Sequence, residues 1–199
     1  YFYCHFSTPA AGQLLQILNN ILYFIENLDS KEIIKIKLDS EEVLPPQGNL
    51  KSSISRPISL GWNIRDRFLS KGLSHALSEG ENFNQLLKES RLSVATYNST
   101  IYYETLAANF PTVIFFDSSL YEINEEAKVY FNLLESVGIF HKTPKSASNF
   151  INSIFDDVNE WWLNEDVQNA RISFCETYAL TSKTYLRDWK FAINKIIKE

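Results

Sequence analysis

Residues 91–117 constrain the fold most, because they show a strand, a turn, a helix and a second strand in close succession. The apolar run 92–96 and the β-branched and aromatic run 112–116 have the length of buried strands. Between them, residues 101–109 have the pattern of a helix that follows a polar turn. Two strands joined through one helix form a right-handed crossover in a parallel sheet. The segment therefore predicts a βαβ unit.

The rest of the chain alternates predicted helices with short predicted strands, and the long segment 39–60, rich in Pro and Ser, is predicted as a loop. Helices are expected over 10–28, 63–71, 82–90, 124–137, 144–155, 158–163, 166–178 and 182–197. Strands are expected over 2–6, 33–38, 73–77, 92–96 and 112–116. This order predicts an α/β fold: an open, mostly parallel, Rossmann-like sheet with helices on both faces and a helical C-terminal tail.

Length and composition are those of one folded unit with an appendage. The chain has 199 residues, of which 45% are hydrophobic, and this is enough for a sizeable core. We assign 1–155 to a Rossmann-like domain and 156–199 to a helical tail packed on the same domain. Because the chain starts with a strand-like segment and contains no Met, we expect a fragment that lacks an upstream domain.

Charge and residue usage argue against several classes of protein. The net charge is −5, so no overall basic field attracts nucleic acid. No apolar run approaches the ~20 residues that span a bilayer, and the start lacks the features of a signal peptide. Two cysteines and three histidines are scattered without metal-site spacing, so we expect no metal and a reduced, cytoplasmic protein.

The turn Tyr97-Asn98-Ser99-Thr100 is the candidate binding site, because ligands of parallel sheets bind at the carboxyl ends of strands. The backbone N–H groups of a helix N-terminus bind phosphate, and two hydroxyls stand at the same place. Glu104, about one turn further on, could accept hydrogen bonds from both hydroxyls of a ribose. The alternative is that Asn98 or Ser99 merely caps the helix and Glu104 is a solvated acid.

Other side chains have two interpretations each. Tyr97 either stacks on a base or packs under the loop, and Arg56 and Lys37 are phosphate-clamp candidates that could equally be surface cations. We expect Trp161 and Trp162 to be packing anchors rather than a sugar-stacking platform. A lone histidine is usually structural, so we expect the same of His141, with proton donation as the alternative.

Residues 96–117, TYNSTIYYETLAANFPTVIFFD, resemble the donor-nucleotide motif in the C-terminal domain of GT-B-type glycosyltransferases. That motif has a hydroxyl-bearing turn, an acid in the helix, a small residue, then Pro and a hydrophobic strand; a glycine that often follows the serine is absent here. Within this group the chain is similar to the LIC-type family of bacterial surface-carbohydrate transferases, relatives of CDP-glycerol glycerophosphotransferases. The likeness lies in 61–68, 83–117 and 155–178.

The resemblance implies the donor-nucleotide-binding half of a glycosyl- or glycerophosphotransferase in surface polysaccharide biosynthesis. Its partners would be a nucleotide-sugar or CDP-polyol donor and a glycan acceptor, with no resident cofactor and no nucleic acid. The implied location is cytoplasmic, at the inner face of the membrane, with at most peripheral association. The catalytic base would come from a missing N-terminal GT-B domain, so this chain alone is expected to bind nucleotide without turnover.

Two alternatives remain open. The first is a non-catalytic α/β interaction module, which would show a helix start blocked by a side chain and a salt-bridged Glu104. The second is a nucleotide-sugar epimerase with the same donor half, which only product analysis would separate from a transferase.

Overall fold

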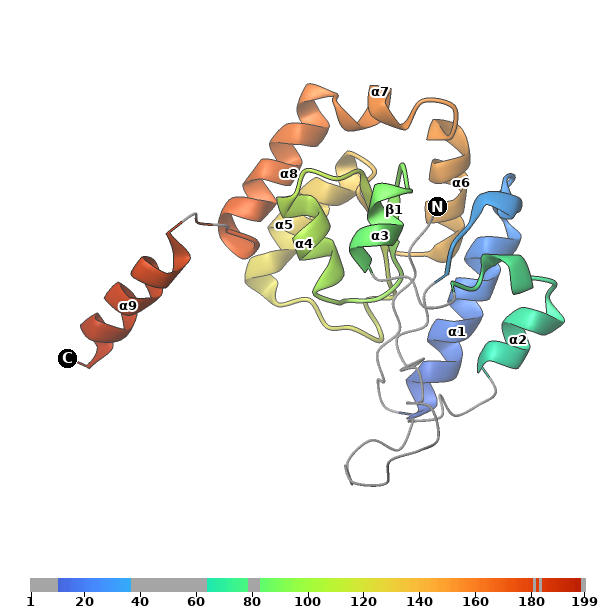
Figure 1. The fold of residues 1–199 in the computed structure, drawn as a ribbon, viewed down its shortest axis with the longest axis horizontal. Helices are drawn as coiled ribbons and strands as arrows, with labels where there is room; N and C mark the ends of the chain where they lie inside the picture. Colours follow the sequence, from blue (N-terminus) through green and yellow to red (C-terminus); the bar gives the residue numbers. More distant parts are fainter. Residues whose placement is uncertain (1–10, 37–63, 79–82, 181, 183, 198–199) are drawn as a thin grey trace.

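A parallel three-stranded sheet is the centre of the computed structural model, which describes residues 11–36, 64–78, 83–180, 182 and 184–197. The strands β1 (Ser93–Ala95), β2 (Thr112–Phe115) and β3 (Phe140–His141) lie in the order β1-β2-β3. Val94 pairs with Val113, and Phe115 pairs with His141. The predicted α/β class and the βαβ unit at 91–117 are confirmed (Figure 1).

Helices surround this sheet and agree with the predicted ones apart from small shifts at their ends. They are α1 (Ala11–Glu26), α2 (Ile64–Ser70), α3 (Phe83–Lys88), α4 (Ile101–Ala107), α5 (Glu125–Ser136), α6 (Pro144–Ile154), α7 (Val158–Trp162), α8 (Glu165–Tyr178) and α9 (Tyr185–Ile196). Two short 3-10 turns, η1 (Lys31–Ile33) and η2 (Ser74–Ala76), complete the described elements. The predicted strand 2–6 and loop 39–60 lie outside the described residues.

The sheet buries both of its faces, as parallel sheets do. Val113 and Phe115 belong to one apolar cluster, which they share with residues of α1 and α6. Ile114 and Phe116 belong to a second cluster, shared with α4, α5 and α8. Because successive residues of a strand point to opposite faces, one strand supplies both cores. The expected helices on both faces of the sheet are therefore present.

The predicted strands 33–38 and 73–77 are wrong for most of their described residues. Ile33 ends η1, Ile36 pairs with Leu77 in an isolated parallel bridge, and residues 37 and 38 lie outside the described residues. The segment predicted as strand 73–77 is mostly η2. Ile34 and Ile36 are buried, so the apolar alternation reflects burial on one side, and the bridge adds two backbone hydrogen bonds, Ile36 N–H to the Ala76 carbonyl and Ser78 N–H to the Ile36 carbonyl. Conversely, β3 was not predicted, because only two of its residues pair and its apolar run is very short.

The C-terminal helices differ in how they pack. Trp162 is buried and donates from Nε1 to Asn109, and the Trp161 Nε1 donates to the Val137 carbonyl at 2.9 Å. These contacts confirm the prediction that the two tryptophans are packing anchors. Helix α8 buries one side against α4 and α5, whereas α9 has no buried residue and extends away from the body (Figure 1). No helix among the described residues is long and apolar enough to cross a membrane.

The amide side chain of Asn152 joins the end of α1 to α6, on the face of the sheet that these two helices cover. Asn152 donates from Nδ2 to the Asn27 carbonyl at 3.0 Å and accepts from the Asp29 N–H at 3.1 Å. Both bonds join residues more than a hundred positions apart in the chain. The two helices also share the first apolar cluster, so this contact closes the core between segments that are far apart in the sequence.

Gly138 ends α5 in a turn that only glycine fits well. The N–H of Ile139 bonds to the Leu134 carbonyl and the N–H of Gly138 to the Glu135 carbonyl, which is the Schellman arrangement. Gly138 has φ +80, and a Cβ on it would lie inside the van der Waals radius of the Phe150 ring. Both the backbone conformation and the packing therefore select glycine here.

We expect Gly138→Ala to lower the free energy of unfolding by about 2–4 kcal/mol, because left-handed strain and overpacking add. Gly72→Ala is the matched control: Gly72 has φ +73 but no atom within 4 Å of the added Cβ. It should cost only about 1–2 kcal/mol. Urea unfolding measures both variants. Equal losses would contradict the packing against Phe150.

Candidate functional site

The candidate site lies at the carboxyl edge of the sheet, where the loops after the three strands meet solvent. Residues 97–100 follow β1, residues 117–121 follow β2, and Lys142 and Thr143 follow β3. Contact between the first two loops is direct, since the Tyr97 and Tyr121 rings lie 6.3 Å apart between centroids. This is the edge at which open parallel sheets bind their ligands.

Helix α4 begins at this edge without a capping side chain. Thr100 is its N-cap residue, and no side chain accepts a hydrogen bond there. By contrast, α5 to α8 are each capped, by Asn124, Thr143, Asp157 and Asn164 respectively. The alternative interpretation, in which Asn98 or Ser99 merely caps the helix, is therefore wrong. The first N–H groups of α4 have no partner within the helix, as at any helix start.

Asn98 has a different role from capping. Its Oδ1 accepts a hydrogen bond from the Tyr102 hydroxyl at 2.6 Å, and the Tyr103 hydroxyl lies 2.9 Å from that of Tyr102. Burial, and next the hydrogen bond with Tyr103, raises the pKa of Tyr102 well above its usual range, so the phenol stays protonated. The bond holds the Asn98 amide over the first turn of α4, with its NH2 group left as a donor.

Of the two interpretations of Tyr97, the structure favours the one in which the ring packs under the loop. Its side chain is only 2% exposed, and its ring packs beside that of Tyr121. A buried ring of this kind supports the loop from below and has no free face for a base.

Two buried hydroxyls at this edge have no hydrogen-bond partner among the described residues. They are the Oγ of Ser99, after β1, and the Oη of Tyr121, after β2. Burial raises the pKa of the Tyr121 phenol, so it is a neutral donor. Because an unpaired buried hydroxyl is costly, each of these groups needs a partner such as a water or a ligand; the Ser93 Oγ, at the other end of β1, is unpaired in the same way among the described residues. The sequence analysis did not select Tyr121 as a site residue. Its position after the second strand of the βαβ unit was the one signal available in the sequence.

Glu104 lies in the first turn of α4, on the solvent side of the same loop. Its side chain is exposed and makes no ion pair with the described residues. Arg56 and Lys37, the clamp candidates, lie outside the described residues. The structure thus gathers Tyr97, Asn98, Ser99, Thr100 and Glu104 at one helix start, and their binding role stays a prediction.

His141 ends β3 as a structural residue. Its Nε2–H donates to the Gly138 carbonyl at 3.0 Å, and its Nδ1 accepts from the Ser146 hydroxyl at 2.9 Å. Burial lowers the pKa of the imidazole below its ordinary 6.5, against the smaller effects of the Gly138 carbonyl and Glu135. Both nitrogens are in use within the fold, which supports the structural interpretation over that of a proton donor.

Comparison with known proteins gives one family. A family model described as LIC12162 family transferase matches residues 47–193, which include β1, α4, β2 and every candidate site residue except Lys37. Neither a curated protein nor a solved structure matches the chain.

The unpartnered Tyr121 hydroxyl gives a test on the free protein. Tyr121→Phe removes a buried group that makes no hydrogen bond, so it should raise the free energy of unfolding by about 1 kcal/mol. Tyr102→Phe is the control, because it deletes a donor that Asn98 accepts, and it should lower stability by about the same amount. Thermal unfolding compares the two variants. A loss of stability in Tyr121→Phe would mean that its hydroxyl is paired.

The lowered pKa of His141 makes stability depend on pH. In the unfolded chain His141 binds a proton near pH 6.5, and in the folded chain it does so only at a lower pH. Between the two pKa values the unfolded state therefore holds more protons than the folded state. The stabilisation is complete above pH 6.5 and is lost as the pH falls below it. In urea unfolding from about pH 8 to about pH 5, His141→Asn should lose less stability than the unchanged chain. His75→Asn, at an exposed histidine, is the control for the substitution itself; identical curves for the unchanged chain and His141→Asn would refute the assignment.

Proposed function

The chain belongs to the LIC12162 family transferases, and from this premise we propose that it is the donor-nucleotide-binding half of a glycosyl- or glycerophosphotransferase in surface polysaccharide biosynthesis. The donor is a nucleotide-sugar or a CDP-polyol, the acceptor is a glycan, and no resident cofactor takes part. The observation that carries the proposal is the pair of buried, unpartnered hydroxyls of Ser99 and Tyr121 at the carboxyl edge of the sheet.

Both hydroxyls suit the phosphates of an activated donor. Phosphate oxygens accept hydrogen bonds without needing a donor of their own, so a phosphate suits both of these donors. Hydrogen bonds to a charged acceptor are stronger than those between neutral groups. The uncapped N–H groups at the start of α4 lie next to Ser99 and add further donors.

Glu104 suits the sugar of the nucleotide. It lies about one helical turn, or ~5.4 Å along the axis, beyond the start of α4. An exposed carboxylate with no ion pair among the described residues is available to accept both hydroxyls of a ribose. Phosphates on the loop and ribose on Glu104 together define one orientation for the donor.

Two features support donor binding over a non-catalytic interaction module. Such a module was expected to block the start of α4 with a side chain and to hold Glu104 in a salt bridge. The start of α4 has no side-chain cap. Glu104 pairs with no cation in the described part of the chain.

In the proposed reaction, the bond between the donor phosphate and the transferred group breaks, and the nucleotide leaves with its negative charge. Donors already oriented at that oxygen stabilise the charge as it develops, without reorganisation. Arg56 and Lys37 are the proposed clamps for this charge. The base that activates the acceptor is proposed to come from an N-terminal GT-B domain of the enzyme, while the residues named above bind the nucleotide.

The test is calorimetric titration of the chain with CMP, CDP, UDP, GDP and ADP. We expect selective binding to one diphosphate, weakened about tenfold or more by Ser99→Ala and by Glu104→Gln, since each removes a hydrogen bond to the ligand. The control is Glu160→Gln, because Glu160 is likewise an exposed acid in the first turn of a helix, α7.

Binding that Ser99→Ala and Glu104→Gln leave unchanged would refute the assigned site. Failure of every nucleotide to bind a chain with an intact unfolding transition would refute the donor half as proposed. Product analysis of the complete enzyme separates transfer from epimerisation, since only transfer consumes the glycan acceptor.

A further inference from the structure

Helix α9 is amphipathic and fully exposed. Tyr185, Trp189, Ile193 and Ile196 recur at spacings of three and four, which places them on one side of the helix. Trp189 is 66% exposed, and none of the residues of α9 is buried. Stable helices in water normally bury such a face, so this one lacks its partner within the described chain. Leu180, which precedes the helix, lines a shallow cavity of about 320 Å³ together with Tyr185 and Trp189. Leu180 thereby extends the apolar face of α9.

The polar side of α9 is basic. The helix contains three basic residues, Arg187, Lys190 and Lys195, and one acidic residue, Asp188. Its net charge is therefore +2, whereas the net charge of the whole chain is −5. Lys190 and Lys195 make no ion pair with the described residues and are fully in solvent. At 100° per residue, Lys190 borders the apolar side and Lys195 lies on the opposite flank.

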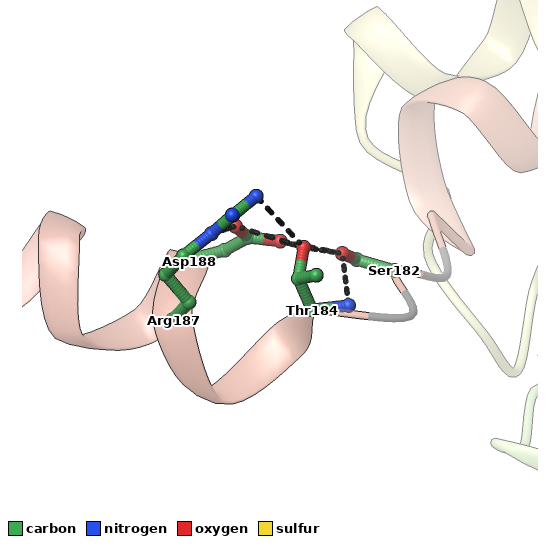
Figure 2. A network of polar contacts seen from close by, with 4 residues as sticks. All are labelled: Ser182, Thr184, Arg187 and Asp188. Carbon is green, nitrogen blue, oxygen red and sulfur yellow. Dashed lines mark hydrogen bonds and ion pairs between the residues drawn. The ribbon is translucent and has the colours of Figure 1, made fainter.

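Asp188, near the start of the helix, takes part in a network of hydrogen bonds and an ion pair (Figure 2). Its carboxylate accepts hydrogen bonds from the hydroxyls of Ser182 and Thr184, and Arg187 lies 3.9 Å from it. The Thr184 N–H donates to the Ser182 hydroxyl at 3.0 Å. This network fastens the first turn to the linker and partly offsets the one negative charge of α9. The cations further along the helix have no such counterpart.

We propose that α9 docks on an anionic membrane surface, with its apolar side in the interface and its cations toward the lipid phosphates. A high amphipathicity, Trp and Ile on one side and Lys and Arg on the other are the features of interfacial helices. With 12 residues the helix is ~18 Å long, too short to span the ~30 Å of a bilayer core. It therefore lies in the plane of the membrane.

The size of α9 argues against a second protein as its partner. One side of a helix of this length offers much less than the ~800 Å² per partner of a stable protein interface. A bilayer imposes no such minimum, because each apolar side chain enters it independently and each cation adds its own attraction. Charge also favours lipid: a helix of positive charge meets a surface of negative charge.

The experiment is co-sedimentation of the full chain with vesicles of phosphatidylglycerol and phosphatidylcholine in equal parts, and with vesicles of phosphatidylcholine alone. We expect binding to the anionic vesicles that falls at high salt and is weak without the anionic lipid. Exchanging both Lys190 and Lys195 for Gln should weaken it about thirtyfold. No nucleotide is needed, so the result is independent of the proposed transferase function.

Trp189→Ser and Phe191→Ser form a matched pair within α9. Both side chains are aromatic and exposed, at 66% and 74%, but Phe191 lies between Arg187 and Lys195 on the polar side. Trp189→Ser should weaken vesicle binding about tenfold or more, and Phe191→Ser should leave it within about twofold. Neither Trp189 nor Phe191 is buried, so both variants should keep the unfolding transition of the unchanged chain.

Three results would overturn the proposal. The first is absence of vesicle binding by the unchanged chain, and the second is equal weakening by Trp189→Ser and Phe191→Ser. The third is a dimer in light scattering that Trp189→Ser abolishes, because a second copy would then cover the face instead of lipid.

Discussion

The fold depends on β2, the central strand. It pairs with β1 on one side and with β3 on the other, and all of its residues are buried. Val113 and Phe115 complete the core under α1 and α6, while Ile114 completes the core under α4, α5 and α8. A polar change at any of these positions would expose a backbone ladder and open one core. The candidate site is built on the residues that directly follow this strand and its neighbour β1.

Tryptophans fasten the C-terminal helices to the ends of helices that cover the sheet. Trp162 donates to Asn109, which has φ 54 and ends α4 in the same kind of turn that Gly138 makes after α5. Arg171 of α8 donates to the Leu106 carbonyl, where the helix dipole of α4 is negative. Side chains of α7 and α8 thus attach to the C-terminal turn of α4. The opposite end of α4, where no side chain caps the helix, remains available to a ligand.

The sequence was sufficient for the parts of the fold that are locally periodic. The runs 92–96 and 112–116 are apolar for a full strand length, so the βαβ unit and the location of its loop were predictable. The predicted strand 33–38 is reduced to one bridge at Ile36 among its described residues, because an alternation of apolar residues reports burial on one side and cannot report how far a neighbouring strand pairs with the backbone. Tyr121 was missed for the same reason: the absence of a partner for its hydroxyl exists only in three dimensions. Family resemblance supplied the assigned roles, and the geometry supplied the burial of Tyr97, which favours packing under the loop.

The contact of Asn152 with the end of α1 has a consequence for biosynthesis. Because ribosomes build a chain from its N-terminus, α1 emerges long before its partner α6, which lies 123 residues later at this contact. Until then the apolar side of α1 has no surface on which to dock, and non-local contacts of this kind form slowly. Nascent chains in this state expose hydrophobic surface and are recognised by chaperones. Completion of the first core is therefore tied to the synthesis of α6, and a pause in translation before residue 144 would prolong the vulnerable state.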